Sequence, residues 1–294
     1  MSMSDHMIVV PGQEITSMQG YLRGHGTYVE EGEQGEPPRL VACVAGVVER
    51  VNKLISVRPI KSRYIGEVGD LVVGRVSEVQ SRRWSVEIGA HKYAVLMLSS
   101  VNLPGGQQRI RTYEDQLQMR TFYQEHDLIS AEVQQVNKDG MIALHTRSLK
   151  YGKLENGQLV SVPSVLIRRL KQHVVSLPGT GVDVILGNNG NVWITRMQPK
   201  EWRGADEGEG SMAPKAETLT RQRKLHAETE IIGEARANIS RVRNAIVALR
   251  NVFHLVNPDS ILEVYRRSVS MGLQPKDMLS GEAVLALTAK EDPT

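Results

Sequence analysis

The sequence predicts a multidomain protein, mostly β with α/β, that ends in a helical region. Three observations support this fold class. Short β-rich runs separated by glycine-containing turns fill residues 8–149, and a second small α/β segment covers residues 154–200. From Ala216 onward the apolar residues recur with a helical period. The 294 residues give room for two or three domains, and the 40% of apolar residues can fill cores of that size.

Residues 1–60 are expected to form an N-terminal β domain. Val9-Val10-Pro11-Gly12 fits a strand and a turn, residues 30–38 form an acidic loop, and residues 40–48 and 54–57 fit further strands. The single cysteine, Cys43, stands in an apolar run and is expected to be buried as a small hydrophobic residue. One thiol can form neither an internal disulfide nor a zinc site, so we expect a reducing compartment.

Residues 61–150 are expected to form a small barrel. The predicted strands cover residues 71–79, 84–88, 94–98, 128–136 and 141–146, with a tight turn at Asp139-Gly140. Five strands with an insertion between the third and the fourth are typical of an OB fold. The insertion, residues 102–126, carries Pro104-Gly105-Gly106 and a predicted short helix over residues 114–124.

Residues 151–202 are expected to form a KH-like module around Gly187-Asn188-Asn189-Gly190. A G-x-x-G loop clamps the nucleic-acid backbone in KH modules. Such a clamp normally joins two helices, whereas this loop lies between two β-branched runs, and Asn-Gly in that setting favours a hairpin. Both interpretations stay open, and the structural turn is the preferred one.

Residues 203–214 are predicted to be a linker, and residues 215–294 a helical region. A stripe of apolar residues predicts one long helix, and Ser260-Ile261-Leu262-Glu263 predicts a capping box that opens a second helix. Gly272 fits the C-terminal end of that helix, and a last helix is expected over residues 282–288. The apolar stripe consists of Ala235, Ile239, Val242, Ile246, Leu249 and Phe253.

The charges are unevenly distributed, although the net charge is only +3. Residues 1–46 carry 2 basic and 6 acidic side chains, and residues 204–294 carry 12 basic and 13 acidic ones. Residues 47–203 carry 22 basic and 14 acidic side chains, a balance of +8. The middle of the chain is therefore where a polyanion would be attracted.

The candidate RNA-binding residues of the barrel are basic and aromatic side chains near its turns. Small barrels hold single strands by stacking bases on aromatic rings and placing phosphates along basic side chains. Trp84 has a second interpretation, because it alternates with Val86 and Ile88 and could fill the interior. Arg109 and Arg111 could draw RNA to a channel or be solvated loop charges. The candidate set is Arg82, Arg83, Trp84, Lys92, Tyr93, Arg109 and Arg111.

The known catalytic patterns are missing from the sequence. It contains no P-loop, no H-E-x-x-H, no G-x-S-x-G and no carboxylate cluster spaced like that of a metal nuclease. We therefore expect no catalytic residue, metal site or cofactor. The N-terminus does not resemble a signal peptide, and no apolar run approaches the length of a membrane span, so we expect no membrane association.

Several short segments, in this order, resemble the RNA-binding cap subunits of the eukaryotic RNA exosome, of the ribosomal-RNA-processing-four type. Each segment is weak alone, but their order and spacing are specific, and the resemblance runs from about residue 8 to residue 200. The segments are Val9-Val10-Pro11-Gly12 and residues 20–28, 46–54, 63–70, 98–100, 102–106, 145–153 and 186–190.

This resemblance implies an N-terminal β domain that docks on a ring, an S1-type OB barrel, a KH module and C-terminal helices. It implies a non-catalytic subunit that guides single-stranded RNA into a ring of RNase-PH-like subunits, beside other cap proteins. The implied role is 3′-to-5′ RNA processing and decay, including ribosomal RNA maturation and surveillance, in nucleus, nucleolus and cytoplasm. Such barrels often carry a basic residue where this chain has Met141, which suggests weaker binding there. The alternatives are a free regulator that binds single-stranded RNA and a hydrolytic enzyme.

Overall fold

The N-terminal strands form two small sheets in the computed structural model, which describes residues 7–18, 20–32, 37–59, 62–101, 112–148, 150–198 and 224–289. One sheet has the strand order β1-β6-β7-β3, and the other has the order β2-β5-β4. Their facing side chains, among them Val9, Leu40 and Ile55, form a small aliphatic core. The strands are β1 (Ile8–Val9), β2 (Glu14–Ser17), β3 (Leu22–Arg23), β4 (Thr27–Glu30), β5 (Arg39–Ala42), β6 (Gly46–Val51) and β7 (Leu54–Pro59).

The chain divides into two units, Met1–Ser62 and Arg63–Thr294. Cys43 belongs to the first unit and is exposed, so the expectation that it would be buried is wrong. The reason is local, because β5 ends at Ala42 and Cys43 lies just beyond the end of this buried strand. The predicted linker, residues 203–214, lies outside the described residues.

The second unit begins with a closed five-stranded barrel. Strand β12 pairs with β10 in parallel and with β11 in the antiparallel sense, which closes the sheet on itself, and β13 extends it beside β11. The elements are β8 (Leu71–Val79), β9 (Arg83–Glu87), β10 (Ala94–Val101), α1 (Tyr113–Leu117), α2 (Met119–Phe122), β11 (Leu128–Val136), β12 (Ile142–Thr146) and β13 (Gly152–Leu154).

Four antiparallel strands form the next sheet, in the order β14-β17-β16-β15. Strand β16 is buried along its whole length because both faces of the sheet are covered. Val182, Val184 and Leu186 face a helical layer, whereas Ile185 packs with Trp193, Leu71 and Val73. The elements are β14 (Gly157–Ser161), the 3-10 turn η1 (Ser164–Leu166), β15 (Val174–Leu177), β16 (Val182–Leu186) and β17 (Asn191–Arg196).

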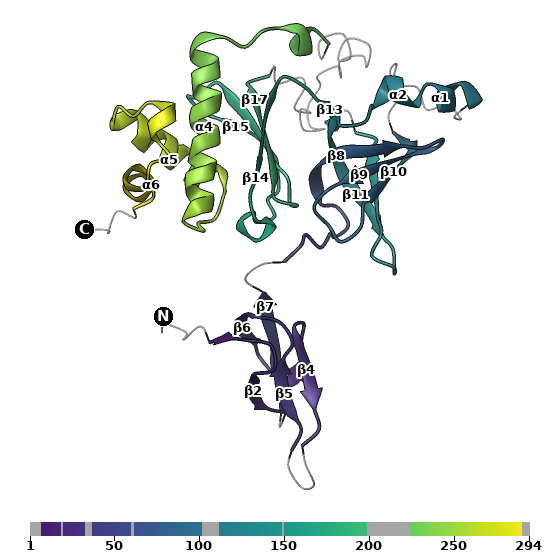
Figure 1. The fold of residues 1–294 in the computed structure, drawn as a ribbon, viewed down its shortest axis with the longest axis vertical. Helices are drawn as coiled ribbons and strands as arrows, with labels where there is room; N and C mark the ends of the chain where they lie inside the picture. Colours follow the sequence, from purple (N-terminus) through teal and green to yellow (C-terminus); the bar gives the residue numbers. More distant parts are fainter. Residues whose placement is uncertain are drawn as a thin grey trace, which may run out of the picture. The chain divides into compact units, whose positions relative to one another are not determined.

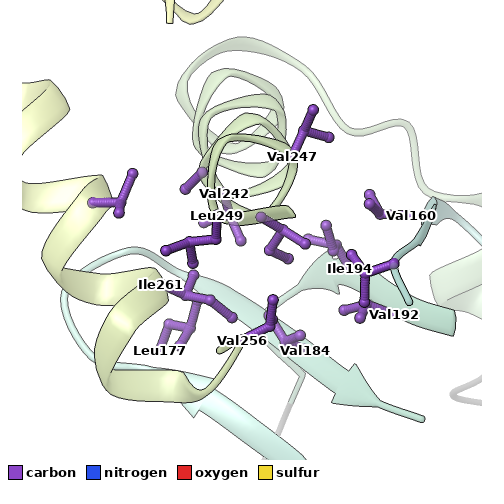
Figure 2. Packing of buried hydrophobic residues seen from close by; sticks show 14 of the residues in the cluster. Val160, Leu177, Val184, Val192, Ile194, Val242, Val247, Leu249, Val256 and Ile261 are labelled. Atoms are coloured by element: carbon purple, nitrogen blue, oxygen red, sulfur yellow. The ribbon is translucent and has the colours of Figure 1, made fainter. Parts of the chain in front are cut away.

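The helices α4 (Gly233–Asn251), α5 (Pro258–Ser270) and α6 (Gly281–Thr288), with the 3-10 turn η3 (Pro275–Asp277), complete this unit (Figure 1). Most of the predicted stripe packs against the sheet, as Val242 and Leu249 do opposite Val184 and Ile194 (Figure 2). Phe253 is the exception, because α4 ends at Asn251 and the Phe253 side chain is 49% exposed. The N-cap of the second helix is Asn257, three residues before the predicted Ser260. Asn257 caps it by accepting a hydrogen bond from the Ser260 amide at 2.7 Å, and Pro258 occupies the first helical turn.

Candidate nucleic-acid interface

Trp84 fills the interior of the barrel. Its side chain is fully buried, and its Nε1–H donates a hydrogen bond to the Tyr123 carbonyl oxygen at 3.0 Å. The two rings meet edge to face, with 5.3 Å between their centroids. No face of the indole is exposed, so Trp84 cannot stack on a base. The second interpretation, in which Trp84 fills the barrel interior, is the one that agrees with the structure.

Arg82 and Arg83 lie exposed at the turn between β8 and β9. Arg82 Nε lies 3.4 Å from Gln116 Oε1 of α1, and Arg83 Nε donates to Gln80 Oε1. Both contacts are with neutral amides, so the two guanidinium charges are not neutralised by these partners. This end of the barrel therefore presents two adjacent cations to solvent.

Lys92 and Tyr93 lie at the other end of β9. Because β9 has five residues and each adds about 3.3 Å, the two pairs of side chains are separated by roughly 16 Å of strand. Tyr93 is 57% exposed, whereas Lys92 Nζ lies 3.4 Å from Asp139 Oδ2. The Met141 amide, and after it Lys92, hold the pKa of Asp139 below its usual range. The predicted set is thus not one contiguous surface, and Arg109 and Arg111 lie outside the described residues.

The loop Gly187–Gly190 is the turn that joins β16 to β17. The amides of Gly187, Asn188 and Gly190 donate to the carbonyl oxygens of Asn191, Leu71 and Gly187, respectively. Asn188 and Asn189 are only 9% and 7% exposed. These amides are therefore engaged within the protein rather than arranged around an open phosphate site, which fits the structural-turn interpretation.

Asn189 joins this loop to the barrel, because its side-chain amide hydrogen-bonds barrel backbone groups as a neighbouring strand would. Its Oδ1 accepts from the Val73 amide at 3.2 Å, and its Nδ2 donates to the Val73 and Ile88 carbonyl oxygens at 2.8 and 2.9 Å. Asn191 Nδ2 also donates to the Val73 carbonyl oxygen. The side chains of Asn189 and Asn191 thus hydrogen-bond the backbone of β8 at Val73, and these bonds join the two modules.

Asp70 is the centre of the same junction and is 3% exposed. Its Oδ1 accepts from Asn188 Nδ2 at 2.7 Å and pairs with Arg169, and its Oδ2 accepts from Tyr64 Oη at 2.6 Å. Burial, followed by this contact with a carboxylate, raises the pKa of Tyr64 above its ordinary value. Asp70 therefore has a structural role, because each of these partners is a protein group at hydrogen-bonding distance.

Sequence reasoning missed two features near this junction. Asp70 and Arg169 are 99 positions apart, so neither suggested the other. An open groove between the barrel and the sheet β14-β17-β16-β15 is lined by Lys150, Arg169 and Lys171. The basic run Arg168-Arg169-Leu170-Lys171, in a segment without helical or strand alternation, is the signal that could have indicated this surface.

Within the described ranges, no group of three or more His, Cys, Asp or Glu side chains is placed to hold a metal ion. No helix of the described part of the chain is long and apolar enough to cross a membrane.

Three known domain families match the chain in the order that the sequence predicts. The N-terminal region described as that of exosome complex exonuclease RRP4 matches residues 8–51, the RRP4 S1 domain matches residues 63–135, and a KH domain matches residues 157–200. The fold is accordingly mostly β, with an S1 OB-like barrel, a KH domain and C-terminal helices.

Relatives that match most of the chain support the same assignment. The chain is 46% identical to exosome complex component rrp4 of Schizosaccharomyces pombe over 262 residues, which cover 89% of this chain and 76% of the relative. It is 48% identical to exosome complex component RRP4 of Bos taurus (94% and 85% covered) and of Mus musculus (94% and 86% covered). The resemblance stated from the sequence is confirmed, and the chain belongs to the RRP4 family.

Proposed function

We propose that this chain is a non-catalytic RNA-binding cap subunit of the exosome. It guides single-stranded RNA into a ring of RNase-PH-like subunits, beside other cap proteins, for 3′-to-5′ processing and decay. Its substrates include ribosomal RNA precursors and RNAs under surveillance. The observation that carries the proposal is the 46–48% identity, along nearly the whole chain, to proteins named exosome complex component RRP4.

The barrel supports the RNA-binding part of this proposal. Its interior is closed by aliphatic side chains and Trp84, so it offers RNA only its outer surface. On that surface, Arg82 and Arg83 are exposed and next to each other at one end. Guanidinium groups bind phosphate bidentately, and a pair of them can hold successive phosphates of a passing strand.

The first unit supports the docking part. Leu22, Val51 and Leu54 are 60%, 64% and 42% exposed, although they are large and apolar. Leu54 pairs with Val51 across β6–β7 and with Leu22 across β3–β7, so the three side chains lie on the same face of one sheet. An exposed apolar cluster of this kind is typical of a protein–protein interface.

We also infer that the protein works in the nucleus, including the nucleolus, and in the cytoplasm. This follows from the proposed substrates, because ribosomal RNA matures in the nucleolus and RNA decay operates in both compartments.

Native mass spectrometry of the affinity-purified chain tests the proposal. The expected result is a stable assembly in which this chain is present once for each set of ring and cap subunits. A chain recovered as a monomer with bound RNA would favour a free regulator instead. Cleavage of single-stranded RNA by the isolated chain, if it disappeared when one carboxylate was replaced, would show a hydrolytic enzyme.

A further inference from the structure

The groove between the barrel and the KH domain has a volume of about 560 Å³. This is within the range of roughly 300–1,000 Å³ in which ligand sites fall. One wall comes from the barrel and from the segment after it, with Asp70, Glu132 and Lys150. The other wall comes from the segment Arg169–Ser176, and Asn188 of the β16–β17 turn also lines the groove.

The cations of this groove are exposed, and its carboxylates are engaged. Lys150 and Lys171 come from different walls, are exposed and form no ion pair among the described residues. By contrast, Asp70 accepts hydrogen bonds from Tyr64 and Asn188, and Glu132 accepts one from Tyr151 Oη at 2.7 Å. An approaching ligand therefore meets two free ammonium groups before any unsatisfied carboxylate.

Asn188 adds a buried acceptor. Its Nδ2 donates to Asp70 Oδ1, and because a carboxylate only accepts, the amide cannot be turned the other way. Its Oδ1 is buried, and no donor in the described part of the chain reaches it. A ligand that extends to this point can supply the missing N–H or O–H group, in addition to negative charge for the two lysines.

We propose that this groove is a second binding site for single-stranded RNA. Lys150 and Lys171 hold phosphates at the rim, and Asn188 Oδ1 accepts a hydrogen bond from a base or from a ribose hydroxyl. A nucleotide supplies both the anion and the donor within each repeating unit. The inference rests on the proposed RNA-binding function and extends it from the barrel turn with Arg82 and Arg83 to a surface built by two domains.

Binding of a fluorescent 12-nucleotide oligoadenylate to the full chain, isolated and in its copurified assembly, tests this inference. The variant Lys150→Glu/Lys171→Glu is expected to bind about tenfold more weakly. The slope of log K against log salt is negative, and its magnitude is expected to decrease by about 1.4. Each lost phosphate contact removes about 0.7 from this magnitude on a single strand. The matched control is Arg266→Glu/Lys276→Glu, which makes the same change in net charge at exposed positions of α5 and η3.

Ultraviolet crosslinking gives a second readout. RNA adducts are expected on peptides that contain Tyr151 or His173, which line the groove, and they are expected to be lost in the groove variant but not in the control. If the wild type binds RNA and the groove variant binds like the control, the groove is not an RNA site, although the proposed function stands. A loss of binding to a glutamate-rich peptide without loss of RNA binding would also overturn the inference. If wild-type chain and assembly both fail to bind RNA, the proposed function itself fails.

Discussion

Arg169 of the KH domain forms an ion pair with Asp70 of the S1 barrel, with 2.8 Å between Nη2 and Oδ1. The same guanidinium lies 2.6 Å from Glu67 Oε2 through its Nη1. The pair is asymmetric, because the side chain of Asp70 is 4% exposed and that of Arg169 is 53% exposed. The two residues should therefore contribute very differently to the stability of the junction.

Replacing Asp70 by Ala is expected to destabilise the second unit by about 3 kcal/mol, because the Tyr64 hydroxyl and the Asn188 amide lose a buried acceptor. Replacing Arg169 by Ala is expected to cost about 1 kcal/mol or less, since most of that charge is already solvated. Urea unfolding followed by tryptophan fluorescence measures both, because every tryptophan lies in the second unit. Equal losses in the two variants would show that the buried carboxylate is not the centre of the junction.

Gly190→Ala is expected to impair folding strongly. The residue has φ 89°, and an added Cβ would lie 2.1 Å from the Val162 carbonyl oxygen. Gly140 is the matched control, because its φ is 81° but an added Cβ would meet nothing within 4 Å. Gly140→Ala should thus cost about 1–2 kcal/mol for backbone strain alone, and Gly190→Ala clearly more.

Unfolding midpoints of the two glycine variants give the comparison, and RNA binding by the folded fraction gives the second measurement. Unchanged RNA affinity is expected for folded Gly190→Ala, since the loop amides bind protein carbonyls. A Gly190→Ala protein as stable as Gly140→Ala but deficient in RNA binding would reassign the loop to the backbone of RNA.

The barrel was the most predictable part of the fold. The predicted strands over residues 71–79 and 128–136 coincide with β8 and β11, because runs rich in apolar, β-branched residues stand there between definite turns. The joint core of barrel and KH domain was not predictable. Residues 182–186 form an almost continuous apolar run, which shows that both faces are covered but not by what.

The candidate site was only partly predictable, for a similar reason. The turn arginines Arg82 and Arg83 were correctly placed at the surface, because a turn has no interior side. Trp84 had two possible roles that alternation alone could not separate, and only its contact with Tyr123 decides between them. The groove residues Lys150 and Lys171 are distant in sequence, so no local pattern brings them together.

His226 is expected to make stability depend on pH. Its Nε2 lies 3.3 Å from Thr195 Oγ1, and burial, followed by the charge of Arg196, lowers its pKa below 6.5. The unfolded chain therefore binds a proton more readily than the folded one, so the stabilisation is present above about pH 6.5 and is lost as pH falls below it.

Urea midpoints between pH 5 and pH 8 measure this effect. The variant His226→Gln, which cannot take up a proton, is expected to lose less stability than the wild type over the acidic part of that range. Parallel curves for the two proteins would show that His226 is not responsible.

The apolar face of the first unit is expected to be required for assembly. The variant Leu22→Ser/Val51→Thr/Leu54→Ser removes exposed apolar surface and should leave folding nearly unchanged, but it should copurify with fewer ring subunits. The matched control is Val269→Ser/Met271→Ser/Leu285→Ser, whose side chains are 52%, 49% and 68% exposed in the helical region. Quantitative mass spectrometry of the purified complexes decides, and wild-type stoichiometry in the first variant would exclude this face as the docking surface.

Arg82→Glu/Arg83→Glu is expected to weaken RNA capture by the assembly without unfolding the chain. The two side chains contact only the amides of Gln116 and Gln80, so their loss should change the free energy of unfolding by less than about 1 kcal/mol. The affinity for single-stranded RNA should fall. The negative slope of log K against log salt should decrease in magnitude by about 1.4 if both arginines contact phosphates.

Crosslinking of RNA to the assembled complex measures the path directly, with Arg266→Glu/Lys276→Glu as the charge-matched control. Because this turn and the groove at Lys150 lie in different parts of the second unit, crosslinks that persist at the groove but vanish at the turn would show that RNA contacts the two surfaces independently. Unchanged crosslinking everywhere would remove this end of the barrel from the RNA path.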